Sequence, residues 1–475
     1  MGQEIAKAQF SDTDFDNFRQ RLGEETALLS RYVREGRCSS QGPITGFELE
    51  AWLVDPDMNP APVNAAFLEA FNGELACPEL AKFNVEFNST PQFVRGEVLS
   101  RVHSDLADLW RRAYMAAESL GVNLLAIGIL PTVPAAALNL SNISELNRFR
   151  ALNEQILSAR RQQPLKLDIS GHQHLTLEHQ DVMLEAAATS FQIHLQVPLE
   201  RVRDYFNTAI LISAPLVAVS ANSPFLFGKD LWSETRIPLF EQAVDSGGYR
   251  DASHGPLHRV GFGSDYARSA ISEVFEENLQ HYPVLLPILS ETPPEQFAHL
   301  RLHNGTIWRW NRPLIGFDPD GRPHIRVEHR VIPAGPSIVD MVANAAFFYG
   351  LIECLANEQS GPPIPFAQAK DNFHQAARYG LDAHMVWQNG EKLPLRSWLL
   401  HELLPKAEFG LKRLGLAEAD IAYYLGIVQQ RALSGQTGSE WQRRFIAKYP
   451  GEFSIMTREY LKRQKSGEPV HQWPL

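Results

Sequence analysis

Four short segments alternate apolar and polar residues and therefore read as β-strands, namely 46–50, 84–88, 192–196 and 326–330. Because strand side chains alternate between two faces, each segment has one apolar face and one polar face. The polar faces carry Glu48 and Glu50, then Asn84, Glu86 and Asn88, then His194, and finally Arg326, Glu328 and Arg330. A solvent-exposed sheet face would look similar for any one segment, but none of the four contains a lysine. Together they favour a cavity lined by carboxylates.

Other stretches repeat their apolar residues at helical spacing. Residues 12–34 end before Gly36 and residues 100–120 end before Gly121, and glycine is common just past the end of a helix. A further helix is expected over 144–161. The most apolar stretches, 209–221 and 341–356, are interrupted by polar residues and fall short of a membrane span. We expect both to be buried helices.

The remaining patterns complete the expected architecture. Residues 122–130 read as a buried strand, and 306–309 and 324–332 read as paired strands around a turn at 318–321. Between 246 and 294 the pattern weakens into mixed helix and loop, and from Asp340 onward it is helical throughout. Strands with a polar inner face and helices on the other side are typical of an α+β fold with a curved antiparallel sheet. We expect a catalytic domain over 1–355 and a helical extension packed on it over 356–475.

Composition narrows the classes of function. The chain has 475 residues, of which 44% are hydrophobic, and is therefore long enough for a large core. Its net charge of -11, without a long basic run, argues against a nucleic-acid partner but not against nucleotide bound with Mg²⁺. The three cysteines are widely spaced, and the first residues do not resemble a secretory signal. We expect a cytoplasmic enzyme with no membrane partner, and the oligomeric state stays open.

The polar strand residues suit one kind of chemistry. Mg²⁺ and Mn²⁺ prefer oxygen ligands and commonly join a few carboxylates to the phosphates of a substrate. The candidate metal ligands, drawn from four strands, are Glu48, Glu50, Glu86, His194 and Glu328. Arg330 and Arg236 would neutralise the charge of a phosphoryl group during transfer, because a planar guanidinium matches phosphate geometry. The sequence therefore predicts metal-dependent phosphoryl transfer.

Familiar motifs for other chemistries are missing from the sequence. It contains no glycine-rich phosphate loop, no dinucleotide fingerprint, no His-Glu-x-x-His helix and no Gly-x-Ser-x-Gly elbow. Any nucleotide must then be held by metals and arginines. His172, His174 and His179 could suggest a zinc site, but they lack a cysteine or acidic partner at suitable spacing, so surface or supporting histidines are favoured.

Taken in order, these segments resemble the glutamate-cysteine ligase family of the second type, including its bacterial carboxylate-amine ligase branch. Residues 46–50 are similar to the opening Gly-x-Glu-x-Glu strand, and 327–330 to a Leu-Glu-x-Arg strand. The most specific match is Ala-Asn-Ser-Pro-Phe at 221–225, followed by Arg236. Further similar segments are 85–91, 189–197 and 372–382.

The resemblance implies a glutamine-synthetase-like fold, in which a funnel of curved antiparallel sheet is covered by helices. It also implies ATP, Mg²⁺ ions and a role in glutathione biosynthesis. The expected reaction transfers the γ-phosphoryl group of ATP to a carboxylate, after which an amine attacks the acyl phosphate. Glu48, Glu50, Glu86, His194 and Glu328 would then hold metal, Arg330 and Arg236 would face phosphate or carboxylate, and Asn222 and Ser223 would line the substrate pocket.

The resemblance leaves two points open. No additional acidic metal ligand is found between the second acidic strand and the following helix, so Asn84 or Asn88 could stand in for it. Residues 246–303 match no segment of the family, and the amine pocket could diverge there. A guanidino-type phosphotransferase on the same architecture and a non-catalytic nucleotide-binding protein remain as alternatives. Release of ADP and phosphate only with Mg²⁺ and both substrates would separate the ligase from these two.

Overall fold

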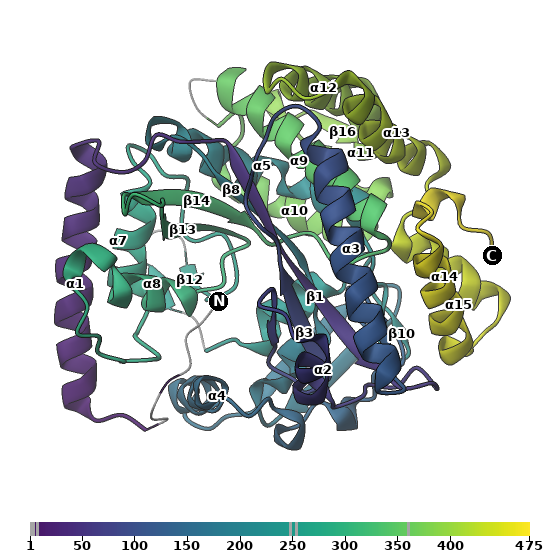
Figure 1. The fold of residues 1–475 in the computed structure, drawn as a ribbon, viewed down its shortest axis with the longest axis horizontal. Coiled ribbons are helices and arrows are strands. Elements are labelled where there is room, and N and C mark those ends of the chain that lie inside the picture. The colour runs from purple at the N-terminus through teal and green to yellow at the C-terminus, as the bar shows by residue number, and fades with distance from the viewer. Residues whose placement is uncertain (1–4, 6–8, 247–248, 252–254, 359–361) are drawn as a thin grey trace.

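A computed structural model describes residue 5 and residues 9–246, 249–251, 255–358 and 362–475 (Figure 1). Its largest sheet has the strand order β13-β14-β8-β1-β3-β2, with β4 and β5 also paired to β1, and every pairing is antiparallel. Its strands are β1 (Ile44–Val54), β2 (Ala76–Pro78), β3 (Asn84–Asn88), β4 (Gln92–Phe93), β5 (Asn123–Leu125), β8 (Phe191–Gln196), β13 (Asn311–Phe317) and β14 (Pro323–His329). This curved sheet with its many helices is the α+β fold expected from the sequence.

The register of the sheet brings the polar residues of different strands side by side. Glu50 lies opposite Glu86 between β1 and β3, and Glu328 lies opposite His194 between β14 and β8. Directly opposed residues of an antiparallel pair share one face. Apolar neighbours on the other face, including Leu49, are buried. A slip of one residue would turn the carboxylates into the apolar core, so the alternation itself fixes the register.

Helices cover the sheet and its edges. In Figure 1, α3 crosses β1, while α1, α7 and α8 gather beside the β13–β14 end and α14 and α15 lie at the opposite side. Helix α5 packs against both β14 and α9. The helices are α1 (Asp12–Arg34), α2 (Asn64–Phe71), α3 (Val98–Ser119), α4 (Asn147–Ala159), α5 (Leu199–Ser220), α6 (Arg236–Ala243), α7 (Ser272–His281), α8 (Ala298–Gly305), α9 (Ile338–Glu358), α10 (Phe366–Tyr379), α11 (Leu395–Trp398), α12 (Leu404–Arg413), α13 (Glu418–Ser434), α14 (Gly438–Lys448) and α15 (Phe453–Ser466).

The two apolar stretches are buried helices, as expected. Residues 209–221 fall in α5 and at its C-terminal end, and 341–356 fall in α9. Among the described residues, α9 is the one helix long and apolar enough to cross a membrane, yet 94% of its apolar window is buried inside the protein. Its hydrophobicity is therefore explained by its central position in the fold. The expected boundary between residues 355 and 356 lies in the last turn of α9, and the division into two domains stays a prediction.

Several expected elements are corrected by the structure. The partner of β14 is β13 at Asn311–Phe317 rather than 306–309, which follows α8 directly. The turn at 318–321 is nevertheless the hairpin turn that the sequence indicated. Only Asn123–Leu125 of the expected strand 122–130 is a strand, because pairing to β1 ends there.

Smaller hairpins complete the chain. The region after Asp340 is not wholly helical, because β15 (His384–Val386) pairs with β16 (Lys392–Pro394). The other two-stranded units are β6 (Leu165–Ser170) with β7 (His174–His179), β9 (Phe225–Leu226) with β10 (Lys229–Asp230), and β11 (Tyr249–Asp251) with β12 (Gly255–Leu257). Part of the expected loop region 246–294, residues 247–248 and 252–254, lies outside the described residues.

Candidate active site

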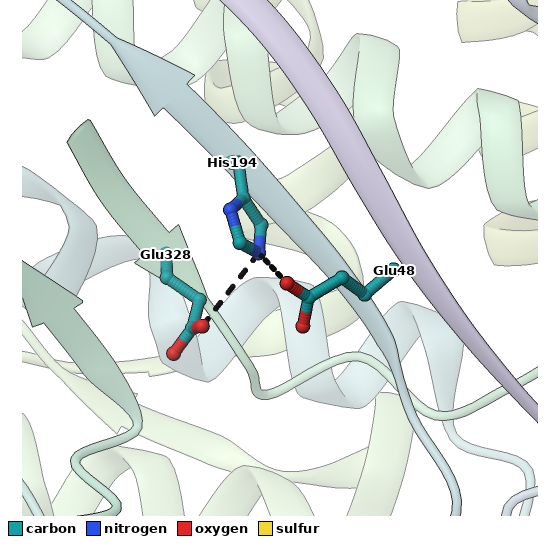
Figure 2. A group of neighbouring side chains, drawn as sticks. All are labelled: Glu48, His194 and Glu328. Atoms are coloured by element: carbon teal, nitrogen blue, oxygen red, sulfur yellow. Dashed lines mark ion pairs between the residues drawn. The ribbon is translucent and has the colours of Figure 1, made fainter. Parts of the chain in front are cut away.

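Three predicted metal ligands meet on the polar face of the sheet, and we call them the first ligand group. They are Glu48 from β1, His194 from β8 and Glu328 from β14 (Figure 2). His194 Nε2 lies 3.1 Å from Glu48 Oε1 and 3.6 Å from Glu328 Oε1. The three residues are 4%, 7% and 0% exposed, respectively. Three neighbouring strands therefore direct one nitrogen and two carboxylates toward a single point.

Arginines balance the charge of the first ligand group. Arg312 donates two hydrogen bonds to Glu328, from Nε at 2.8 Å and from Nη2 at 3.1 Å. Arg330 donates to the same carboxylate from Nη1 at 3.3 Å. Although burial favours the neutral acid, Arg312, Arg330 and His194 together hold the pKa of Glu328 well below its usual range. These contacts therefore favour the anionic form of Glu328.

The atoms of the first ligand group lie close together, but some of them form no hydrogen bond. Within the described part of the chain, Glu48 Oε2 and His194 Nε2 are buried and have no hydrogen-bond partner. Buried polar atoms without partners are rare, and they often indicate a missing ion or ligand. The candidate ligand atoms of the group lie within 4.8 Å of one another, a spacing compatible with donors to a single Mg²⁺ or Mn²⁺. The residues present fit a divalent cation.

A second group of carboxylates lies further along the same face, and we call it the second ligand group. It joins Glu50 of β1 and Glu86 of β3 to Glu79, which lies just after β2. Glu50 accepts hydrogen bonds of 2.7 Å from the backbone of Ser190 and from Gln192. These contacts orient Glu50 while its remaining lone pairs stay free for a cation.

The second ligand group has little positive charge around it. Burial, with Glu79 as a neighbour, raises the pKa of Glu50 to about 7 despite Arg330 nearby. Burial and the carboxylates of Glu48, Glu79 and Glu50 raise the pKa of Glu86 well above its usual value. Carboxyl groups that repel one another in this way are relieved by a shared cation, so this group also fits a divalent metal.

Glu79 is a further acidic candidate ligand, which the sequence pattern did not indicate. It precedes the second acidic strand instead of following it, and it lies next to Pro78 after a strand of only three residues. No alternating pattern marks so short a strand. Asn84 and Asn88, which could stand in for the missing acidic ligand, differ in their contacts. Asn88 donates a 2.9 Å hydrogen bond to Glu86, whereas the side chain of Asn84 is buried without a hydrogen-bond partner among the described residues.

The two predicted arginines occupy different surroundings. Arg330 donates to Gln192 and Glu328 and also interacts electrostatically with Glu50 and Glu48, so it touches one ligand group and neighbours the other. Arg236 begins α6 and is 2% exposed. Its Nε lies 3.3 Å from Glu234 Oε1, and its Nη2 donates to the carbonyl of Val331 beside Arg330. Contact between Arg236 and a substrate stays a prediction.

Asn222 and Ser223 are buried in a hydrogen-bond network of the protein. Asn222 Nδ2 donates to the Ala334 carbonyl and to the Tyr460 hydroxyl, both at 2.8 Å. Ser223 Oγ donates at 2.6 Å to Glu234, the carboxylate that also holds Arg236. Both residues are 0% exposed. In this structure they hold the segment that leads into α6 and Arg236, and their expected contact with a substrate stays a prediction.

The histidines considered for zinc have different partners. His172, His174 and His179 each contact a different aspartate, at 3.0, 2.8 and 2.9 Å, respectively. The corresponding partners are Asp230, Asp168 and Asp181. Across the described ranges, the groups that could hold a metal are the two ligand groups above, and neither contains these histidines.

The polar face of the curved antiparallel sheet carries buried carboxylates, a histidine and arginines, which is the arrangement that the sequence resemblance implied. The sequence model of "Glutamate-cysteine ligase family 2" matches residues 44–467, and the chain therefore belongs to that family. It is a carbon-nitrogen ligase of the carboxylate-amine type, as the sequence resemblance implied.

Two relatives illustrate the match. A protein of Nocardia farcinica (strain IFM 10152), provisionally named glutamate-cysteine ligase 2-2, is 25% identical over 428 residues, which cover 87% of this chain and 93% of the relative. A protein of Thermobifida fusca (strain YX), provisionally named glutamate-cysteine ligase 2, is 35% identical over 136 residues, or 25% of this chain and 33% of the relative.

Two solved structures share the fold. The glutamate-cysteine ligase of Francisella tularensis, determined in complex with AMP, superposes with a TM-score of 0.53 at 13% identity and covers 89% of both chains. A bifunctional glutathione synthetase of Pasteurella multocida gives a TM-score of 0.50 at 11% identity, covering 92% of this chain and 54% of that one. At such low identity the likeness shows the fold alone.

Proposed function

We propose that this protein is an ATP-dependent ligase that joins a carboxylate to an amine through an acyl-phosphate intermediate, with Mg²⁺ or Mn²⁺ as the metal. The observation that carries this proposal is the presence of two ligand groups on one sheet face with Arg330 beside both. The AMP bound to the Francisella ligase supports a nucleotide substrate. Glutamate is the default carboxylate, by analogy with the family.

The proposed reaction has two steps. In the first, a carboxylate oxygen bonds to the γ-phosphorus of ATP, and the bond from that phosphorus to the β-γ bridging oxygen breaks to release ADP. In the second, the amine nitrogen bonds to the acyl carbon, the bond from that carbon to the phosphate oxygen breaks, and phosphate leaves. The nitrogen loses a proton to the surrounding solvent. The products are the amide, ADP and phosphate.

The residues on the sheet face would supply binding and charge. Glu48, His194 and Glu328 would hold one divalent cation, and Glu50, Glu79 and Glu86 would hold another. Bound cations would reduce the repulsion between the attacking carboxylate and the phosphates. Arg330 would stabilise the charge of the phosphoryl group during transfer, because its guanidinium is already oriented by Gln192 and Glu328. Arg236 is proposed to add positive charge behind Arg330.

We also propose that the enzyme acts in the cytoplasm on small carboxylate and amine substrates. The three cysteines, Cys38, Cys77 and Cys354, are free thiols in the structure, which agrees with a reducing compartment.

The proposal can be tested by a coupled assay of ADP release. Purified protein is mixed with Mg-ATP, glutamate and a panel of amino acids and polyamines, and the product is identified by mass spectrometry. We expect ADP release that requires Mg²⁺ and both substrates, with an amide as product, and a loss of the signal in Glu48→Gln and Glu328→Gln. Full activity of both variants, or a stable phosphorylated product without an amide, would contradict the proposal.

A further inference from the structure

Three arginines of the β13–β14 hairpin lie near Glu328, but only two of them are paired with it. Arg312 forms a two-bond pair with this carboxylate, and Arg330 contacts it through Nη1. Within the described residues, no carboxylate lies within 4.0 Å of a guanidinium nitrogen of Arg326. Glu48 and Glu328 are near enough to favour its charged form without forming an ion pair. Among the described residues, Arg326 is therefore a half-buried cation with no carboxylate in ion-pair contact.

The surroundings of Arg326 add further positive charge. Its guanidinium lies over Gly316 of β13, where an added Cβ would come within 2.6 Å of Nη1. Burial, and to a smaller extent Arg301 of α8 and Arg312, lower the pKa of Arg326. Arg301 also has no carboxylate within 4.0 Å among the residues that the structure describes. Two neighbouring positive charges without a carboxylate beside them, one of them partly removed from water, favour an anionic ligand.

A hydrogen bond links Arg326 to the first ligand group. Arg326 Nε donates to His194 Nδ1 at 3.1 Å. A nitrogen that accepts a hydrogen bond carries no proton, so the neutral imidazole must hold its proton on Nε2, the atom that faces Glu48 and Glu328. A cation at Nε2 needs the lone pair of that atom, and the proton must then move to Nδ1. Arg326 can no longer donate to Nδ1 in that form.

Cation binding at the first ligand group would also cancel the negative charge that stabilises the charged form of Arg326. Glu48 and Glu328 would be neutralised by the cation, and the guanidinium would be left beside a divalent ion with its hydrogen bond to His194 broken. An anion bound beside Arg326 would balance the positive charges of its guanidinium and of the divalent ion. In the proposed reaction the anion available there is the phosphate chain of the nucleotide.

We propose that Arg326 is a binding residue for the nucleotide phosphates and that it becomes available only when a cation displaces it from His194. This inference rests on the proposed function, which supplies the nucleotide. It explains why one of the three arginines is left without a carboxylate. Arg301, exposed at the side of Arg326, would strengthen the attraction for phosphate.

The test compares two affinities of the variant Arg326→Met, measured by calorimetry without catalysis. The first is the affinity for Mn²⁺ alone, and the second is the affinity for a non-hydrolysable ATP analogue in saturating Mn²⁺. We expect Mn²⁺ alone to bind about two- to tenfold more tightly, because no hydrogen bond to His194 has to be broken. We expect the analogue to bind roughly 10- to 100-fold more weakly, because a charge-assisted contact to phosphate is lost.

Opposite changes in the two affinities separate this role from a merely structural one, which would weaken both. Arg322→Met is the matched control, since Arg322 lies in the same hairpin in an exposed pair with Asp320, and it should change neither affinity. Arg326→Lys should keep more analogue affinity than Arg326→Met, because it retains the charge but not the planar donor fork.

Four outcomes would contradict the inference or the proposed function. Equal analogue binding by the wild type and Arg326→Met would overturn this inference alone, as would a parallel loss of both affinities. Absence of analogue binding by the wild type would overturn the proposed function itself. If the variant does not fold, a crystal structure of the wild type with Mn²⁺ and the analogue decides the matter. A guanidinium of Arg326 within hydrogen-bond distance of a phosphate oxygen supports the inference, and one still bonded to Nδ1 overturns it.

Discussion

The two ligand groups lie on the same sheet face but differ in how their charge is balanced. In the first group, Glu328 is paired with Arg312 and Arg330, and these arginines lower its pKa. In the second group, Glu50, Glu79 and Glu86 lie beside one another without an ion pair to any described residue, and burial and neighbouring carboxylates raise the pKa values of Glu50 and Glu86. The protein itself neutralises the first group and leaves the second to be neutralised by a proton or a cation.

This difference predicts that neutralising one acid has opposite effects on the stability of the fold in the two groups. Neutralising an acid in the first group leaves buried arginine charge without a partner and should destabilise the fold. Neutralising an acid in the second group relieves repulsion and should stabilise the metal-free fold. Both changes should reduce activity, because both groups are proposed to hold metal.

The largest effect is expected from Glu328→Gln. Activity should fall roughly 100- to 1,000-fold or more, since the proposed cation loses a ligand and the orientation of Arg330 is lost. The free energy of unfolding should fall by about 3–5 kcal/mol, because Arg312 is left as an unpaired buried charge. The measurements are ADP release and urea unfolding.

A double variant, Arg312→Met with Glu328→Gln, sharpens this prediction. Removing both partners should restore much of the stability without restoring activity. Recovery of activity together with stability would show that Glu328 acts only through the fold, and would contradict its assignment as a ligand.

The next effect is expected from Glu79→Gln in the second group. Activity should fall at least about tenfold, because a proposed metal ligand is lost. The metal-free variant should nevertheless unfold at a higher urea concentration than the wild type at pH 8, because one repelling carboxylate is gone. Glu74→Gln, an exposed acid shortly before β2, is the control and should change neither quantity. A destabilised Glu79→Gln variant would contradict the contrast between the groups.

The pH dependence of stability should also separate the groups. The pKa of Glu50 is raised from 4.5 to about 7 in the folded state, so folding is favoured by the proton that Glu50 binds. This contribution is fully present below about pH 4.5 and is lost as the pH rises through about 7. Metal-free protein should therefore lose stability between pH 5 and pH 8 relative to Glu50→Gln, and saturating Mg²⁺ should remove the difference. An identical pH profile for the two proteins would refute this prediction.

The smallest effect is expected from His174→Ala. His174 lies on β7 and contacts Asp168 at 2.8 Å, and both side chains are more than half exposed. The free energy of unfolding should change by less than about 0.5 kcal/mol, and the amount of bound metal should not change. Loss of a tightly bound zinc ion in this variant, measured by elemental analysis, would revive the zinc site that the sequence analysis set aside.

Much of the site could be predicted from alternation alone. Glu48, Glu50, Glu86, His194 and Glu328 stand on strands whose two faces differ clearly, and the structure places them in the two groups. Glu79 was missed because a three-residue strand carries no measurable period. Arg312 was missed because its strand was expected five residues too early, which placed this residue in a loop.

The limits of the fold prediction have similar causes. The strand expected over 122–130 is buried throughout most of its length, but hydrophobicity does not show where its hydrogen-bonded partner ends. The hairpin β15–β16 consists of strands of three residues each, and such short strands are fixed by tertiary contacts. Among these contacts, the side-chain amide of Asn372 in α10 donates to the carbonyl of Val386 and accepts from its backbone N–H. The sequence alone does not show such contacts.

The most direct test of the central claim is an anomalous difference map from crystals grown with Mn²⁺ and a non-hydrolysable ATP analogue. The account predicts two peaks on the polar face, each about 2.0–2.3 Å from its ligand atoms. One peak should lie among Glu48, His194 and Glu328, and the other among Glu50, Glu79 and Glu86. Manganese bound elsewhere, with both ligand groups empty, would contradict the account.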